Sequence, residues 1–114
     1  MPVTPKTLIG APGPNRLIVP IQIWNTIVTS NPAIPYQDAG TNTPQLIYNL
    51  GSFGIASDSS ILGSLAQTTS YYTPISGTLA GTLVNQPLTI STLTQPVVGD
   101  SVLYSYIIYT IVNV

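Results

Sequence analysis

Residues able to perform acid–base or metal chemistry are few in this chain and lie far apart. The 114 residues include no His and no Cys, and the carboxylates are limited to Asp38, Asp58 and Asp100. General acid–base catalysis uses His or paired carboxylates, and zinc sites use His or Cys. Each aspartate lies in a turn-like segment, where Asp commonly bonds its own backbone. We therefore expect structural aspartates, no catalytic residue, no metal site, no cofactor and no enzymatic activity.

Other routes to chemistry are equally poor. A Ser–Lys pair would need Lys6, which lies in a proline-rich segment. The turns at Asp38–Gly40 and Gly99–Asp100 do not form the acidic loop of an EF-hand. The glycines of Gly10–Pro14 alternate with prolines, which lack the amide donors that bind phosphate. Two cations cannot form a basic patch, so nucleic acid is not expected as a partner.

The low charge is the most unusual feature of the composition. Only 4% of residues are charged, against about 25% in typical globular domains. The net charge of −1 offers little repulsion between copies, so self-association is expected. Apolar runs are too short to cross a membrane, and no signal peptide is apparent at the N-terminus. We therefore predict a homo-oligomer that does not bind membranes.

Aromatic residues are the strongest candidates for a binding surface. Adjacent residues in a strand point to opposite faces, so Tyr71 and Tyr72 must diverge, and Tyr109 must oppose Tyr104 and Tyr106. Several rings are therefore expected outside the core, where Tyr and Trp favour interfaces. A sugar-binding platform using Trp24, Tyr71 and Tyr72 is the alternative, and burial in the core is a third use for several of these rings. The predicted interface comprises Pro5, Leu8, Ile9, Pro12, Trp24, Tyr71, Tyr72, Tyr104, Tyr106 and Tyr109.

The elements that must position these rings are strands. Apolar residues at strand spacing, with turn residues between them, predict strands within 16–29, 45–51, 87–94 and 101–114. The β propensity of Thr and Tyr predicts a further strand within 68–74. Within 16–29 the odd positions form the more strongly apolar face, and Pro20 indicates an edge strand or a bulge. Both faces of 101–114 are apolar or aromatic, which predicts a central strand covered on two sides. The fold class predicted is all-β, an antiparallel β-sandwich or a jelly-roll-like barrel.

Three other segments carry weaker patterns. A short strand is possible through 33–37, and a short helix capped by Ser57 or Asp58 competes with an irregular connection in 53–67. The glycine-rich segment 77–85 is expected to contain a turn. Residues 1–15 are proline-rich and predict an extended N-terminal arm, with an ordered edge segment as the alternative. Residues 16–114 then form a single β-sandwich domain.

Two segments resemble short virion proteins of tailed bacteriophages. Leu8–Ile23, LIGAPGPNRLIVPIQI, is similar to their opening, in which an apolar Pro-Gly turn leads into a long strand. Leu83–Val114 is similar to their ending: an Asn-x-Pro-Leu strand, a Gly-Asp loop and a long terminal strand rich in Val, Ile and Tyr. Together they cover about half of the chain. Unlike that pattern, the strand ends in Thr110–Val114 without a basic residue.

The resemblance implies a small β-sandwich attached to a capsid or a tail. Decoration or cement proteins of this kind are often trimers, placed at local three-fold positions of the capsid lattice. The function that it implies is a structural virion protein that binds the major capsid protein on the capsid surface and stabilises the head. A subunit associated with the tail or a fibre is the alternative, and a carbohydrate-binding β-sandwich is a third hypothesis.

Overall fold

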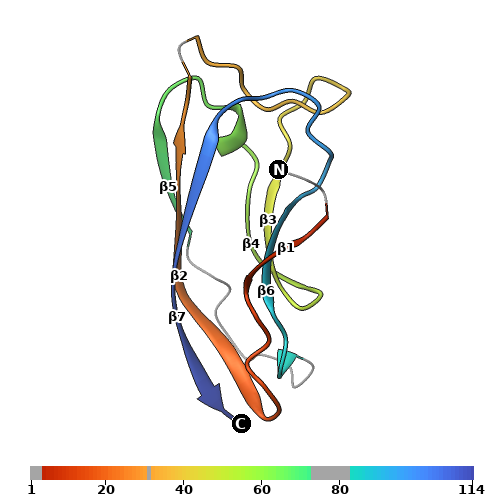
Figure 1. Ribbon diagram of the computed structural model, residues 1–114, viewed down its shortest axis with the longest axis vertical. Helices are drawn as coiled ribbons and strands as arrows, with labels where there is room; N and C mark the ends of the chain where they lie inside the picture. Colours follow the sequence, from red (N-terminus) through yellow and green to blue (C-terminus); the bar gives the residue numbers. More distant parts are fainter. Residues whose placement is uncertain (1–3, 31, 73–82) are drawn as a thin grey trace.

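The structure, a computed structural model, describes residues 4–30, 32–72 and 83–114 and is built from two antiparallel sheets (Figure 1). A single turn of 3-10 helix, η1, spans Ile61–Gly63. The strands are β1 (Lys6–Ile9), β2 (Arg16–Val28), β3 (Leu46–Leu50), β4 (Phe53–Asp58), β5 (Thr68–Tyr72), β6 (Leu88–Thr92) and β7 (Val102–Asn113).

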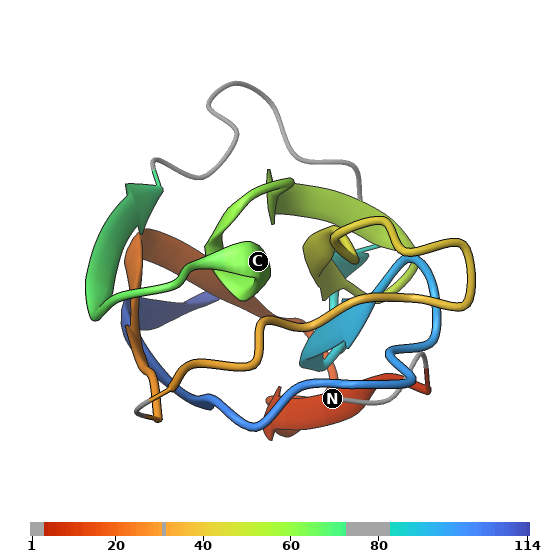
Figure 2. The ribbon, with the colours of Figure 1, turned by 90° about the horizontal axis from the view of Figure 1, so that it is seen from above.

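The two sheets form the layers of a sandwich. One has four strands in the order β1-β6-β3-β4, and the other has three in the order β5-β2-β7. Figure 2 shows the two layers seen from above, with η1 between them at one end. The predicted all-β antiparallel sandwich is confirmed, and the sheets do not close into a barrel.

The core lies between the sheets and is formed by alternate residues of their strands. Ile23 and Ile27 of β2 belong to the same buried hydrophobic cluster as Leu46 and Leu50 of β3. The predicted bulge at Pro20 is confirmed, because the pairing of β2 with β7 shifts register between Pro20 and Gln22. Among the described residues, β5 pairs with Ile23–Ile27 of β2, so Pro20 lies outside that ladder and its missing N–H breaks no bond in it. β2 itself is the central strand of its sheet, not an edge strand.

The prediction of a central, doubly covered strand at 101–114 is wrong. β7 pairs only with β2 and forms one edge of the three-stranded sheet. Side chains on its outer face are exposed, as Val102 and Ile108 illustrate. An apolar two-faced pattern normally indicates burial on both sides. Here the outward half of that pattern faces solvent.

Strands at 46–50, 68–72 and 88–92 match three of the predicted segments. The possible strand through 33–37 is reduced to one isolated bridge between Gln37 and Val98. Within 53–67 the chain forms strand β4, which was not predicted, followed by η1 as a single helical turn. Most of the predicted turn segment 77–85 lies outside the described residues.

Part of the proline-rich N-terminal segment belongs to the sandwich. β1 pairs with β6, with Lys6 opposite Ile90 and Ile9 opposite Leu88. Leu8 and Ile9 also pack against the core. For these residues the structure shows an ordered edge strand, which was the alternative to an extended arm.

Candidate interaction surface

Four aromatic residues, Trp24, Tyr71, Tyr104 and Tyr106, lie on the outer side of the three-stranded sheet, away from the core. Trp24 of β2 lies directly opposite Tyr71 of β5 and directly opposite Tyr106 of β7. Directly opposed residues of antiparallel strands point to the same face, so these three rings form a row across the sheet. We call this side the outer face; its residues are Gln22, Trp24, Thr26, Val28, Thr69, Tyr71, Val102, Tyr104, Tyr106 and Ile108.

Contacts between neighbouring strands order the side chains of the outer face. The rings of Trp24 and Tyr106 are stacked, with centroids 5.3 Å apart and planes 12° from parallel. In the next row the hydroxyls of Thr26 and Thr69 are 3.0 Å apart and share a hydrogen bond. Cross-strand pairs of this kind stabilise a sheet and hold its side chains in place. The outer face is therefore an ordered surface.

Exposure of large uncharged side chains distinguishes this face. Tyr71 is 70% exposed, Tyr104 is 50% exposed and Ile108 is 46% exposed. No residue of the outer face is charged. Contiguous exposed apolar and aromatic surface of this kind is typical of an interaction site.

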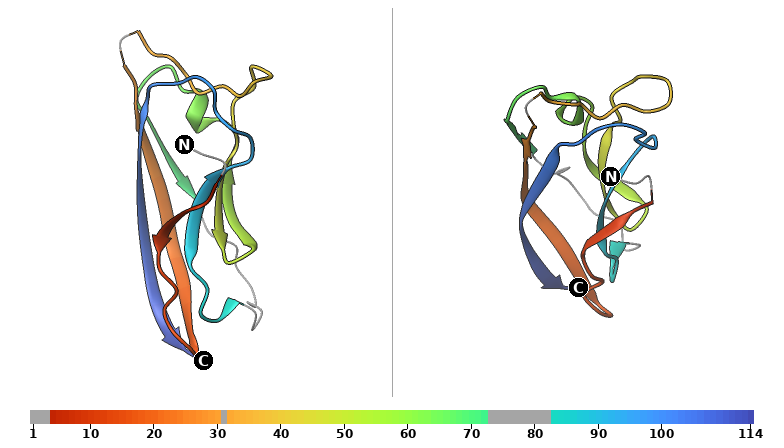
Figure 3. Two further views of the ribbon diagram at one scale, coloured as in Figure 1. Left: turned by 45° about the vertical axis from the view of Figure 1, so that its right-hand side comes forward. Right: turned by 45° about the horizontal axis from the view of Figure 1, so that its top comes forward.

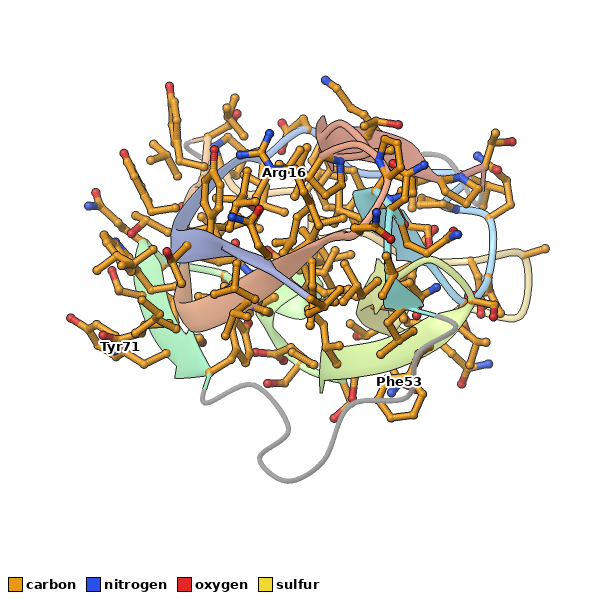
Figure 4. All side chains as sticks on the ribbon, turned by 90° about the horizontal axis from the view of Figure 1, so that it is seen from below. Arg16, Phe53 and Tyr71 are labelled. Atoms are coloured by element: carbon orange, nitrogen blue, oxygen red, sulfur yellow. The ribbon has the colours of Figure 1, made fainter. Side chains whose placement is uncertain are left out.

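The structure brings only some of the predicted interface residues together. Trp24, Tyr71, Tyr104 and Tyr106 lie on the outer face. Tyr72 turns inward, as the alternation predicted, and its hydroxyl donates a 2.5 Å hydrogen bond to Asp58. Figure 4 shows Tyr71 projecting from β5 away from the body of the sandwich.

A second group lies where the edges of the two sheets approach each other. Leu8 and Ile9 of β1 line an open pocket of about 240 Å³ together with Ser105, Ile107 and Tyr109 of β7. We call it the β1–β7 pocket. Tyr109 is thus separated from Tyr104 and Tyr106, as expected from the strand period. Pro5 is exposed before β1, and the carbonyl of Pro12 accepts a hydrogen bond from the guanidinium of Arg16.

Each aspartate caps or closes a turn. The carboxylate of Asp38 accepts hydrogen bonds from the amides of Gly40 and Asn42, and the Asn42 amide is the main cause of its lowered pKa. The carboxylate of Asp100 accepts from the Ile34 amide. Within the described residues, no three His, Cys, Asp or Glu side chains come together as metal ligands do.

Asp58 closes the turn before η1 and is the most constrained of the three. Its carboxylate accepts hydrogen bonds from the amides of Ser60 and Ile61 and from the Tyr72 hydroxyl. Burial acts to raise the pKa of Asp58, but these hydrogen bonds outweigh it and the pKa is lowered overall. Burial and the bond to Asp58 in turn raise the pKa of Tyr72. The pair links β5 to the end of β4, so its role is structural.

Ile108, Val102 and the threonine pair belong to the outer face but were absent from the predicted interface. The signal for the two apolar residues was present, because both share the even-numbered face of β7 with Tyr104 and Tyr106. The threonines carried no such signal, since their place on this face follows from the pairing of β2 with β5.

Comparison of the chain with family models, curated proteins and solved structures gave no match. Among residues 4–30, 32–72 and 83–114, no helix is long and apolar enough to cross a membrane. The similarity to tailed-phage virion proteins therefore stays a prediction that rests on the two quoted segments.

Proposed function

We propose that the protein is a structural subunit that docks through its outer face onto the surface of a larger protein assembly. The observation that carries this proposal is the uncharged row of Tyr71, Trp24 and Tyr106 on an ordered, solvent-facing sheet. Burying such a face removes apolar area from water without desolvating any charge. The resemblance supplies the assembly: a phage capsid, with the major capsid protein as the partner and stabilisation of the head as the result.

Protein is favoured over sugar as the occupant by the arrangement of the rings. A sugar stacks on the open face of an aromatic ring. The stack between Trp24 and Tyr106 occupies one face of each ring, since their planes are nearly parallel. Within this row, Tyr71 takes part in no ring stack, whereas Trp24 and Tyr106 each have one face left. A protein partner, in contrast, can pack against ring edges and the neighbouring aliphatic side chains.

The test uses particles of the phage that encodes the chain. Labelled protein is added to particles purified without it and located by electron microscopy. Label distributed over the head supports the cement assignment. Label on the tail or fibres rejects it in favour of the alternative virion role, and no label on any part rejects both.

Two variants show whether the outer face makes the contact. Tyr71→Asp places a charge at the most exposed ring of the row. Phe53→Asp is the matched control, because Phe53 is 43% exposed and belongs to the other sheet. Figure 4 shows the two side chains projecting from different sheets. Loss of particle binding at least tenfold greater for Tyr71→Asp supports the outer face, and equal loss excludes it.

A glycan array tests the carbohydrate hypothesis with the same proteins. Specific glycan hits that disappear in Tyr71→Asp, together with quenching of Trp24 fluorescence by those glycans, would show that the outer face binds carbohydrate. The proposal predicts an array without hits.

A further inference from the structure

β7 is the longest edge strand of the described sandwich, and no other described strand pairs with its free side. It has 12 residues, whereas the other edge strands β1, β4 and β5 have 4, 6 and 5 residues. Short length is one common way of preventing an edge from pairing with another chain. β7 lacks that protection.

Charge, proline and a bulge are also absent from β7. Charged residues and bulges discourage edge pairing. Strand β1 includes Lys6 and a register irregularity at Thr7–Ile9, and β4 includes Asp58 and an irregular register opposite Tyr48 and Asn49. β7 contains no charged residue and no proline, and the irregularity of the β2–β7 pair falls at Ile21 of β2. Figure 3 shows β7 as a long, smooth strand at the outside of its sheet.

Main-chain groups on the free side of β7 can be identified from the hydrogen bonds at its end. The amide of Val114 donates to the carbonyl of Asn15, so it points toward the chain that leads into β2. Asn113 lies opposite Arg16, whose carbonyl instead accepts from Asn85. The direction of the amide alternates along a strand. The amides of Asn113, Ile111 and Tyr109 therefore point away from β2, and no other described residue accepts a backbone hydrogen bond from them.

We propose that β7 pairs antiparallel with β7 of a second copy around a two-fold axis. An antiparallel edge is complementary to itself, because each exposed donor and acceptor meets its equivalent on the other copy. β7 carries no charge, and the chain has a net charge of only −1, so two copies do not repel each other. The joined sheet has six strands, and its two outer faces become continuous.

The size of the contact determines its expected strength. A strand of 12 residues is about 40 Å long, and a contact about 10 Å wide buries roughly 400 Å² per copy. A standard stable interface buries about 800 Å² per partner, so the edge contact alone belongs to the weak class. We expect a dissociation constant in the micromolar range. The mass of the protein should then rise from 12.0 kDa toward twice that value as concentration increases.

Cross-linking tests the geometry directly, because the chain has no native cysteine. In the proposed dimer, the β7 amides that point away from β2 donate hydrogen bonds to the other copy. This pairing places odd-numbered residues opposite odd-numbered ones. The two registers of this kind nearest to full overlap of Val102–Asn113 place Ile107 or Ile108 on the two-fold axis, where a residue faces its own copy. Even-numbered residues then form the non-hydrogen-bonded pairs, whose Cβ atoms approach to about 4.5 Å, within reach of a disulfide.

A series of single-cysteine variants at even-numbered positions of β7 gives the readout. The positions are Tyr104, Tyr106, Ile108 and Thr110, with Phe53→Cys on β4 as the exposed control. With Ile108 on the axis, the yield of disulfide dimer should peak at Ile108→Cys; with Ile107 on the axis, it should peak equally at Tyr106→Cys and Ile108→Cys. In both registers the yield should be at least fivefold lower at Tyr104→Cys and Phe53→Cys. Equal yields along the series overturn it.

Sedimentation equilibrium of proline variants provides the second measurement. Ile111→Pro removes an amide on the free side, whereas Ile111→Ala retains it and loses the same side chain. The pair should differ at least tenfold in dimerisation constant, with both variants showing wild-type circular dichroism. A monomer at all concentrations, or a trimer as the resemblance implies, overturns the edge contact. Neither outcome bears on particle binding, so the edge contact and the proposed function fail separately.

Discussion

The hydroxyl of Tyr48 donates a 2.5 Å hydrogen bond to the Oδ1 of Asn25, and this contact joins the two sheets through the core. Ser105 of β7 also donates to the same oxygen at 2.6 Å. Tyr48 and Asn25 are fully buried. A buried polar network of this kind resists sliding of one sheet over the other, because sliding would leave its polar groups unpaired.

Tyr48→Phe should destabilise the protein by about 1–2 kcal/mol. The substitution preserves the ring but removes a buried hydroxyl that donates to Asn25. Urea denaturation should show a lower midpoint with an unchanged slope. Tyr104→Phe is the control, since Tyr104 is 50% exposed, and its effect should stay within about 0.5 kcal/mol. Equal effects for the two variants would contradict a role for the network.

The Asp58–Tyr72 pair predicts a loss of stability in acid. The pKa of Asp58 is lowered from its ordinary value of 3.8 in the folded protein. When the pKa of a carboxyl group is lower in the folded state, the ionised group stabilises the protein at pH values above its unfolded pKa. That stabilisation is lost as the pH falls through the folded pKa. Unfolding free energy should therefore decrease below about pH 3.8. Asp58→Asn should flatten this decrease, and an unchanged acid profile in the variant would contradict the assignment.

Tyr72 predicts a loss of stability at alkaline pH. Burial and the bond to Asp58 raise the pKa of Tyr72 above its ordinary value of 10.0. When the pKa of a group is higher in the folded state, the group stabilises the protein at pH values below its unfolded pKa. That stabilisation is lost as the pH rises from the unfolded pKa toward the folded pKa. Stability should thus decline above about pH 10, and Tyr72→Phe should reduce the slope of that decline. Thermal melts across the alkaline range measure the difference.

Gly99 is expected to tolerate no side chain. Its φ is +137°, and a Cβ atom there would lie 2.3 Å from the Cδ1 of Tyr36. The hydroxyl of Tyr36 donates to the Ser101 carbonyl, which fixes the ring against the loop. Gly99→Ala should cost about 2–4 kcal/mol in unfolding free energy. Gly10→Ala is the matched control because nothing lies within 4 Å of its Cβ position, and it should be nearly neutral.

Some features of the fold could be predicted from the sequence because they depend on local residue patterns, and others could not. Patterns of apolar residues located β2, β3, β6 and β7, because a sandwich buries one face of each strand, and the β propensity of Thr and Tyr located β5. The apolar pattern wrongly predicted that both faces of β7 are covered. Apolar residues on the outward face give the same sequence pattern whether that face packs against a sheet or is exposed to solvent. β4 was missed because Gly54, Ser57 and Asp58 resemble a loop.

In the candidate interaction surface, too, local features could be predicted and features set by tertiary pairing could not. The alternation separated Tyr71 from Tyr72 and Tyr109 from Tyr106 correctly, since that rule depends only on the strand period. The row of Tyr71, Trp24 and Tyr106 could not be predicted, because register between strands depends on tertiary pairing. Asn25 was likewise overlooked among the isoleucines of β2, although a lone polar residue on a buried face indicates an internal hydrogen bond.

The central claim is that the outer face binds the assembly, and particle binding by wild-type protein, Tyr71→Asp and Phe53→Asp tests it most directly. The measurement is the number of labelled copies bound per purified particle at saturation, located by electron microscopy. The account predicts saturable binding of the wild type and Phe53→Asp over the head, with binding by Tyr71→Asp reduced at least tenfold. Wild-type protein that does not bind, or Tyr71→Asp that binds like the wild type, would contradict it.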